Sequence, residues 1–271
     1  MTSDIDEAID WQGLEIECGA CAHGELRATG RCALKHACVH DRYARRIDRF
    51  FSWNPELSSS YIDHPHFEVR AIAAKFADVF LLPPLLADPD ETVRWNAVRR
   101  LPRRYLLLLR KDPHREVRIR VASLLTGADL IPMMRDEDYY VRLTVARRIA
   151  PDLLPSMMAD VEAEVRRVVA SRIEGNALYR MASDEDPEVR LAAVRRLEPA
   201  DLLGFHRDPD WRVRYEAASR AEPRLLRDML DDPDEMVREF VLNRLEQQEE
   251  PDNSNVVRLE PRSSREPFGR R

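Results

Sequence analysis

Residues 88–101 read DPDETVRWNAVRRL, and this stretch contains the pattern that decides the fold. Asp88 can cap a helix, Pro89 suits its first position, and Glu91 would complete a capping box. With helical spacing, the apolar residues fall within an arc of about 140°; they are Val93, Ala97, Val98 and Leu101. Because Pro102 follows, we expect the helix to end there.

The same pattern returns every 24 residues. The dipeptide Val-Arg occurs at 69–70, 93–94, 117–118, 141–142, 165–166, 189–190, 213–214 and 237–238. An aspartate keeps the same interval at 88, 112, 136, 160, 184, 208 and 232. Eight units without an insertion predict a solenoid, in which each unit buries its apolar face against its neighbours.

The second half of each unit is too short for another full helix. Residues 150–160 read APDLLPSMMAD, with Pro151 and Pro155 only four residues apart. An interior proline breaks an α-helix, whereas a short 3₁₀ helix accommodates this spacing. Since no segment shows the alternation of a strand, we predict an all-α solenoid of eight 24-residue repeats, each an α-helix followed by a short 3₁₀ helix.

Two sets of arginines recur with the repeat. The arginine ladder consists of the arginines of the Val-Arg pairs: Arg70, Arg94, Arg118, Arg142, Arg166, Arg190, Arg214 and Arg238. Its members lie on the apolar side of the helix, so each needs an anion or a carbonyl partner. We therefore predict that each bonds an aspartate or backbone carbonyl of its own or an adjacent unit.

The second set lies at the edge of the apolar face: Arg100, Arg148, Arg172, Arg196, Arg220 and Arg244. Along a stack these side chains would form a basic stripe that could hold phosphate or an acidic partner. The alternative is a solubilising face balanced by acidic residues. The formal net charge of −6 gives no general attraction to nucleic acid.

All four cysteines lie in residues 17–38, ECGACAHGELRATGRCALKHAC. Cys18, Cys21, Cys32 and Cys38 have the spacing C-x₂-C-x₁₀-C-x₅-C, which suits four thiolates around one inorganic centre. Structural zinc usually takes two C-x₂-C pairs, whereas a [4Fe–4S] cluster accepts more varied spacing; the spacing leaves both open. We expect the neighbouring histidines to lie outside the ligand set; they are His23, His36 and His40.

A four-cysteine segment followed by 24-residue DPxxxVRxxAA units resembles the leucine-rich repeat variant (LRV) iron–sulfur protein family. The resemblance implies a small [4Fe–4S] domain followed by alternating α- and 3₁₀-helices in a right-handed superhelix. It assigns the role of cluster ligands to Cys18, Cys21, Cys32 and Cys38. We accordingly expect a cluster domain at 1–54, a repeat solenoid at 55–248 and a disordered tail at 249–271.

Several classes of function are disfavoured. The N-terminus has no apolar signal region and no apolar run approaches a membrane span, so we expect a cytoplasmic protein with no membrane partner. A cluster with four cysteine ligands has no open coordination position, and neither a phosphate-binding loop nor a nucleophile–base set is recognisable, so we expect no enzyme.

Two functions stay open. The first is a protein-interaction scaffold with a redox, sensing or structural [4Fe–4S] cluster, whose partner protein binds the solenoid surface. The alternative is a zinc-capped solenoid that binds nucleic acid through the arginine stripe.

Overall fold

The computed structural model describes residues 6–249. It forms two compact units, Met1–Glu174 and Gly175–Arg271, and each is described by itself. Of the tail expected at 249–271, residues 250–271 lie outside the described part. Within residues 6–249 the structure is helical, with isolated backbone bridges in place of any longer strand.

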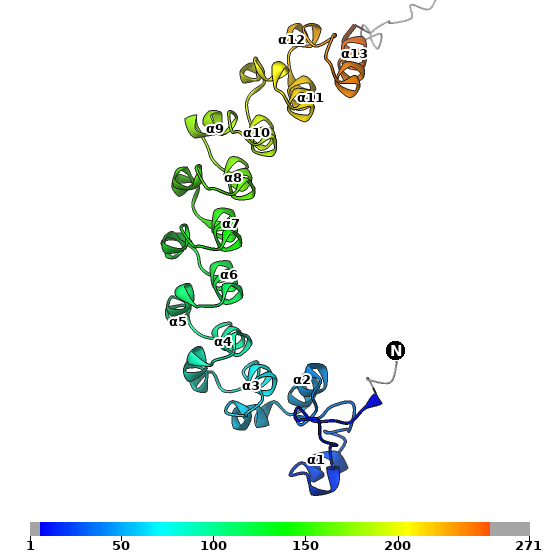
Figure 1. Ribbon diagram of the computed structural model, residues 1–271, viewed down its shortest axis with the longest axis vertical. Coiled ribbons are helices and arrows are strands. Elements are labelled where there is room, and N and C mark those ends of the chain that lie inside the picture. Colours follow the sequence, from blue (N-terminus) through cyan, green and yellow to red (C-terminus); the bar gives the residue numbers. More distant parts are fainter. Residues whose placement is uncertain (1–5, 250–271) are drawn as a thin grey trace, which may run out of the picture. The chain divides into compact units, whose positions relative to one another are not determined.

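In the first unit, the longer helices stack in chain order, and the short helices alternate with them along one edge (Figure 1). Its elements are η2 (Cys18–Ala20), α1 (Gly24–Ala28), α2 (Ala44–Trp53), η3 (Pro55–Tyr61), α3 (Phe67–Ala73), η4 (Val79–Leu81), η5 (Pro83–Ala87), α4 (Glu91–Val98), α5 (Arg103–Leu106), η6 (Leu108–Lys111), α6 (Arg115–Leu124), η7 (Gly127–Met133), α7 (Tyr139–Arg148), η8 (Pro151–Met157) and α8 (Ala163–Ala170).

The second unit repeats the same plan. Its elements are α9 (Asn176–Met181), α10 (Pro187–Val194), η9 (Pro199–Leu202), η10 (Phe205–Arg207), α11 (Trp211–Arg220), α12 (Pro223–Arg227) and α13 (Glu235–Glu249). Every Val-Arg pair lies in a helix, namely α3, α4, α6, α7, α8, α10, α11 or α13. The predicted solenoid of α-helical 24-residue units is therefore confirmed.

The helices begin later than the sequence analysis predicted. In α4 the capping residue is Asp90, whose side chain accepts hydrogen bonds from the backbone N–H groups of Thr92 and Val93. The prediction that Asp88 caps this helix was wrong. The carboxylate of Asp88 instead accepts bonds from Arg70 and from the N–H of Asp90, so it joins two units and orders the turn before the helix.

Interior prolines account for some of the connecting segments. Pro132 and Pro155 lie inside the 3₁₀ helices η7 and η8. A proline lacks the N–H that an α-helix needs, so these segments adopt the tighter helix. Segments without an interior proline take either form: α9 is a short α-helix, whereas the segment of α5 continues as the 3₁₀ helix η6. The 3₁₀ prediction thus holds for some units but not for all.

The core lies between the helices and these short segments. Val93 and Ala97 of α4 are fully buried, and they pack in one cluster with Leu82 and Leu85 of the preceding connection. Small side chains recur on the helix, so neighbouring helices approach closely. Each unit buries its apolar face only because another unit covers it, which is the physical basis of the repeat.

The arginine ladder joins consecutive units, as predicted. Arg94 Nε and Nη2 donate to the two carboxylate oxygens of Asp112, both at 2.7 Å. Its Nη1 donates to the backbone carbonyls of Asp88 and Pro89. The same bidentate pairing occurs in Arg70–Asp88, Arg118–Asp136, Arg142–Asp160, Arg190–Asp208 and Arg214–Asp232. These guanidinium groups are largely buried, and their bonds to carboxylates and backbone carbonyls give them a structural role.

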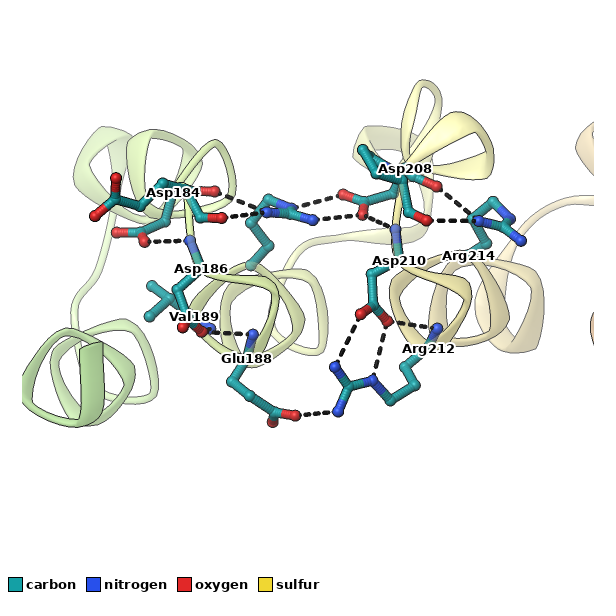
Figure 2. Close-up of polar contacts among 11 residues, drawn as sticks. Asp184, Asp186, Glu188, Val189, Asp208, Asp210, Arg212 and Arg214 are labelled. Atoms are coloured by element: carbon teal, nitrogen blue, oxygen red, sulfur yellow. Dashed lines mark hydrogen bonds and ion pairs between the residues drawn. The ribbon is translucent and has the colours of Figure 1, made fainter.

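An exposed contact accompanies the ladder in the second unit (Figure 2). Arg212 of α11 pairs with Asp210, the cap of its own helix, and reaches back to Glu188 of α10. Arg214 points the other way and donates to the carbonyl of Asp208. Neighbouring arginines of one helix therefore hold different parts of the stack.

The second arginine set is also used within the stack. Arg172 donates to the carbonyls of Ala146 and Ile149, at the end of the preceding helix. Arg100, Arg148, Arg220 and Arg244 likewise donate to carbonyls 23 to 26 residues earlier. Cations at a helix C-terminus satisfy its unpaired carbonyls and favour its dipole. These side chains are therefore helix caps supplied by the next unit rather than a free stripe.

The last helix leaves a stacking position open. Leu242 of α13 is 48% exposed, whereas the residues at the equivalent position in the same compact unit, Val194 and Ala218, are 0% exposed. Arg238, the ladder arginine of this helix, donates to the carbonyl of Asp232 but has no carboxylate partner within residues 6–249. Within residues 6–249, no further helix covers this face of α13.

Candidate metal centre

The four cysteines lie in the module that precedes α2. Cys18 begins η2, Cys21 follows it directly, and Cys32 and Cys38 come after α1. All four are free thiols. Cys38 is buried and the other three are partly buried. The module thus places every thiol of the chain in one small region without a disulfide between them.

Tight turns arrange the first pair. After η2, the thiol sulfur of Cys21 accepts the backbone N–H of His23 at 3.4 Å, and the N–H of Gly24 bonds the carbonyl of Cys21. At the end of α1, Gly30 adopts the left-handed conformation with φ of 74°, which an L side chain rarely adopts. This turn sends the chain back toward Cys32.

A narrow hairpin carries the second pair. Ala33 and Ala37 exchange backbone hydrogen bonds of 2.9 and 2.8 Å between Cys32 and Cys38. The turn between them places Lys35 at φ 62°, a left-handed conformation that is uncommon for a residue other than glycine. Such strain persists only where the surroundings hold the chain in place.

Burial and the charge of neighbouring thiols make Cys32 and Cys38 hard to ionise. Burial raises the pKa of Cys38 to about 12, and the neighbouring Cys32 and Cys21 contribute in the same direction. The pKa of Cys32 is also raised, first by burial and then by Cys21 and Cys18. Thiolates here would repel one another unless a cationic centre lay between them.

A set of four cysteines can hold either a single metal ion or a cluster. Within the described residues, no three side chains of the types that ligate metals are close enough to hold a single ion. A zinc ion binds sulfur at about 2.3 Å and so draws its ligands tightly together. A cluster of four irons binds one cysteine at each iron and spreads them further apart. The four free thiols match such a cluster in number, with one cysteine for each iron.

Aromatic and imidazole rings surround the thiols. His23 hydrogen bonds the Tyr61 hydroxyl and packs against Phe50, with ring centroids 5.2 Å apart. Burial raises the pKa of Tyr61 to about 12, with further contributions from Cys21, Cys38 and Cys32. No motif in the sequence marks Tyr61 as part of the site. Because it is the last residue of η3, its place in the site depends on the packing of η3 against α2.

The histidines near the thiols have other partners. The pKa of His23 and of His40 is lowered, chiefly by burial, which favours neutral rings. His36 accepts hydrogen bonds from Arg49 at both its carbonyl and its ring Nδ1, each at 2.8 Å. We predicted that these side chains lie outside the ligand set, and their contacts give them other roles.

The fold and site define a class: a helical solenoid of 24-residue units preceded by a four-cysteine module. Residues 8–60 match the family model described as "LRV protein FeS4 cluster". A solved structure titled "a leucine-rich repeat variant with a novel repetitive protein structural motif" superposes with a TM-score of 0.82 at 43% identity, covering 85% of this chain and 99% of that one. The chain belongs to the leucine-rich repeat variant family.

A curated relative has a shorter match. The protein described as "Uncharacterized 27.7 kDa protein in nifB 3'region" of Rhodobacter capsulatus is 53% identical over 96 residues. The match covers 35% of this chain and 39% of that protein. Of the expectations about localisation, the structure addresses one point: within residues 6–249, every helix is too short or too polar to span a bilayer.

Proposed function

We propose that this chain is an iron–sulfur scaffold protein, in which Cys18, Cys21, Cys32 and Cys38 hold a [4Fe–4S] cluster. The observation that carries the proposal is the placement of four free, partly or fully buried thiols in one small module. The match of residues 8–60 to an FeS4 cluster model supports it. When bound, such a cluster would supply a one-electron redox centre and a cross-link between distant parts of the module.

The residues of the chain would hold and shield this centre. The turn at Cys21 and the hairpin at Cys32–Cys38 present the thiols, while His23, Phe50 and Tyr61 pack beside them. These rings would limit the access of water and so influence the potential of the centre. With four cysteine ligands no coordination position stays open, and the proposal gives the protein no catalytic step.

The solenoid would provide the surface for a partner protein in the cytoplasm. A groove of about 640 Å³ crosses α2, α3 and α4. Phe67 and Ile72 lie at its apolar part, and Glu68 and Lys75 are among its charged residues. An apolar centre with a polar rim is typical of surfaces that bind proteins. Binding to nucleic acid is less well supported, since the arginines proposed for it bond backbone carbonyls within the stack.

Anaerobic purification with analysis of iron, sulfide and zinc tests the proposal. We expect about four irons and four sulfides per chain, as a [4Fe–4S] cluster requires. Reduction should produce an EPR signal of a cluster, and Cys32→Ser should remove most of the iron. Zinc without iron would overturn the assignment of the cluster. A cluster that cannot be reduced at accessible potentials would show that its role is structural.

A further inference from the structure

The segment that carries Cys32 and Cys38 lies along α2, running in the opposite direction. At one end, Asn54 Nδ2 donates to the carbonyl of Arg31 at 2.9 Å. In the middle, Arg49 Nη1 donates to the carbonyl and the ring of His36. At the other end, the N–H of Cys38 bonds the carbonyl of Arg46 at 3.2 Å. Helix α2 thus holds the segment at three levels.

Helix α2 is itself part of the repeat stack. Arg46 occupies the ladder position, since it lies 24 residues before Arg70. Ile47 and Phe50 of α2 share a hydrophobic cluster with Val69 and Ile72 of α3. The helix is therefore held by the solenoid on one side while it holds the cysteine segment on the other.

The ladder arginine of α2 has been redirected toward the cysteine module. The position where other units carry the ladder aspartate is occupied by His64. Arg46 instead pairs with the buried Asp41 at 2.8 Å and donates to the carbonyl of Glu7 at 2.7 Å. The bond that elsewhere links two repeats here links the first repeat helix to the N-terminal segment of the module.

The first pair of cysteines is held differently. The bonds at Cys21 come from His23 and Gly24, within the same turn. The second pair depends on α2, and its turn contains the strained Lys35. A strained turn keeps its shape only if its neighbours hold it, and Arg49 bonds the residue next to Lys35 at two points.

We infer that Arg49 and Asn54 are positioning residues for the iron–sulfur centre, holding the segment from Arg31 to Cys38 so that Cys32 and Cys38 meet the cluster. The inference rests on the proposed function. Through these two side chains, retention of the cluster depends on the first helix of the solenoid. The cluster module is by this arrangement the cap of the repeat stack as well as a metal centre.

Arg49→Gln tests the inference, because it removes the contacts with His36 while keeping a polar side chain at this partly buried position. Arg45→Gln is the matched control: it lies one turn earlier on α2, is exposed, and has no hydrogen bond or ion pair among the described residues. Both variants and the unchanged protein are purified anaerobically in the loaded form. The rate of iron release to a chelator, the visible circular dichroism and the EPR spectrum are then measured.

We expect Arg49→Gln to release iron about 10- to 100-fold faster, as loss of partners that orient metal ligands commonly weakens metal binding by this factor. Its cluster spectra should shift, while the urea midpoint of the metal-free form changes little. Arg45→Gln should match the unchanged protein in every measurement. If Arg49→Gln does not fold, His36→Ala removes the ring contact from the other side and takes its place, with the same expected acceleration.

Equal release rates and identical spectra in all three proteins would overturn the inference while leaving the proposed cluster in place. An unchanged protein that contains no iron after anaerobic purification would instead overturn the proposed function and the inference with it. Faster release in both variants would show that α2 as a whole, rather than the contact of Arg49, stabilises the centre, and would also contradict the inference.

Discussion

Replacing Asp112 by alanine should strongly destabilise the repeat stack. Asp112 accepts three hydrogen bonds, two from Arg94 at 2.7 Å and one from the N–H of His114 at 2.8 Å. The side chains of Arg94 and Asp112 are 9% and 1% exposed. The substitution leaves a buried guanidinium without its anion, and water can reach it only poorly.

The expected magnitude follows from this burial. Removing one partner of a buried ion pair costs about 3–5 kcal/mol. For a chain of this size, each kcal/mol lowers the melting temperature by roughly 2–4 °C. Asp112→Ala should therefore lower the melting temperature by roughly 6–20 °C. Because the stack is linear, the loss can appear as early unfolding of the neighbouring units rather than as one shifted transition.

Urea unfolding followed by circular dichroism measures the effect, and a double-mutant cycle assigns it. Arg94→Leu combined with Asp112→Ala removes both charges, so the pair should be less destabilised than the sum of the single variants, by about 2 kcal/mol or more. Glu164→Ala is the control, since its ion pair with Arg167 is exposed and should contribute no more than about 1 kcal/mol. The reasoning is refuted if Asp112→Ala costs no more than this control, or if the cycle shows additivity.

Two further predictions use the same stack. Leu242→Lys should change the free energy of unfolding by no more than about 0.5 kcal/mol because that position is exposed, whereas Ala218→Lys at the equivalent buried position should cost several kcal/mol; similar losses in chemical denaturation would contradict the open stacking face. The pKa of Asp88 is lowered in the folded protein, because the bond from Arg70, the N–H of Asp90 and nearby positive charge outweigh the opposing effect of burial. The ionised carboxylate therefore stabilises the fold at pH values above its unfolded pKa of about 3.9, and this stabilisation is lost as the pH falls through the folded pKa. Asp88→Asn should accordingly reduce the dependence of stability on pH below about pH 4. If the pH dependence of unfolding in acid is the same in this variant, Asp88 makes no such contribution.

The structural role of the arginine ladder was predictable because the sequence contains both partners at one interval. An arginine on the apolar face needs an anion, and an aspartate recurs with the same 24-residue period. The cap was not predictable in the same way. Asp88 and Asp90 are two residues apart and both suit an N-cap. Asp88 is the carboxylate that pairs with Arg70, which leaves Asp90 to cap the helix.

The candidate site shows a similar division. The cysteines could be found from their spacing, and their role as ligands stays a prediction. Arg49 and Asn54 carry no motif, and each is an ordinary polar residue of a helix or its end. One signal was available: Arg46 lies in the repeat register, which indicates that α2 stacks like a repeat helix. The contacts of α2 with the cysteine segment require the folded hairpin.

By itself, the sequence determined the repeat length, the alternation of helix and short turn, and the confinement of all thiols to one module. These features are local, because period, proline position and cysteine spacing act over a few residues. The tertiary structure decided which aspartate caps a helix and that Arg172 and its equivalents cap the preceding helix. It also decided that α2 supports the second pair of cysteines. Those choices depend on which donors and acceptors become neighbours when units stack, and burial makes each unpaired group costly enough to determine the outcome.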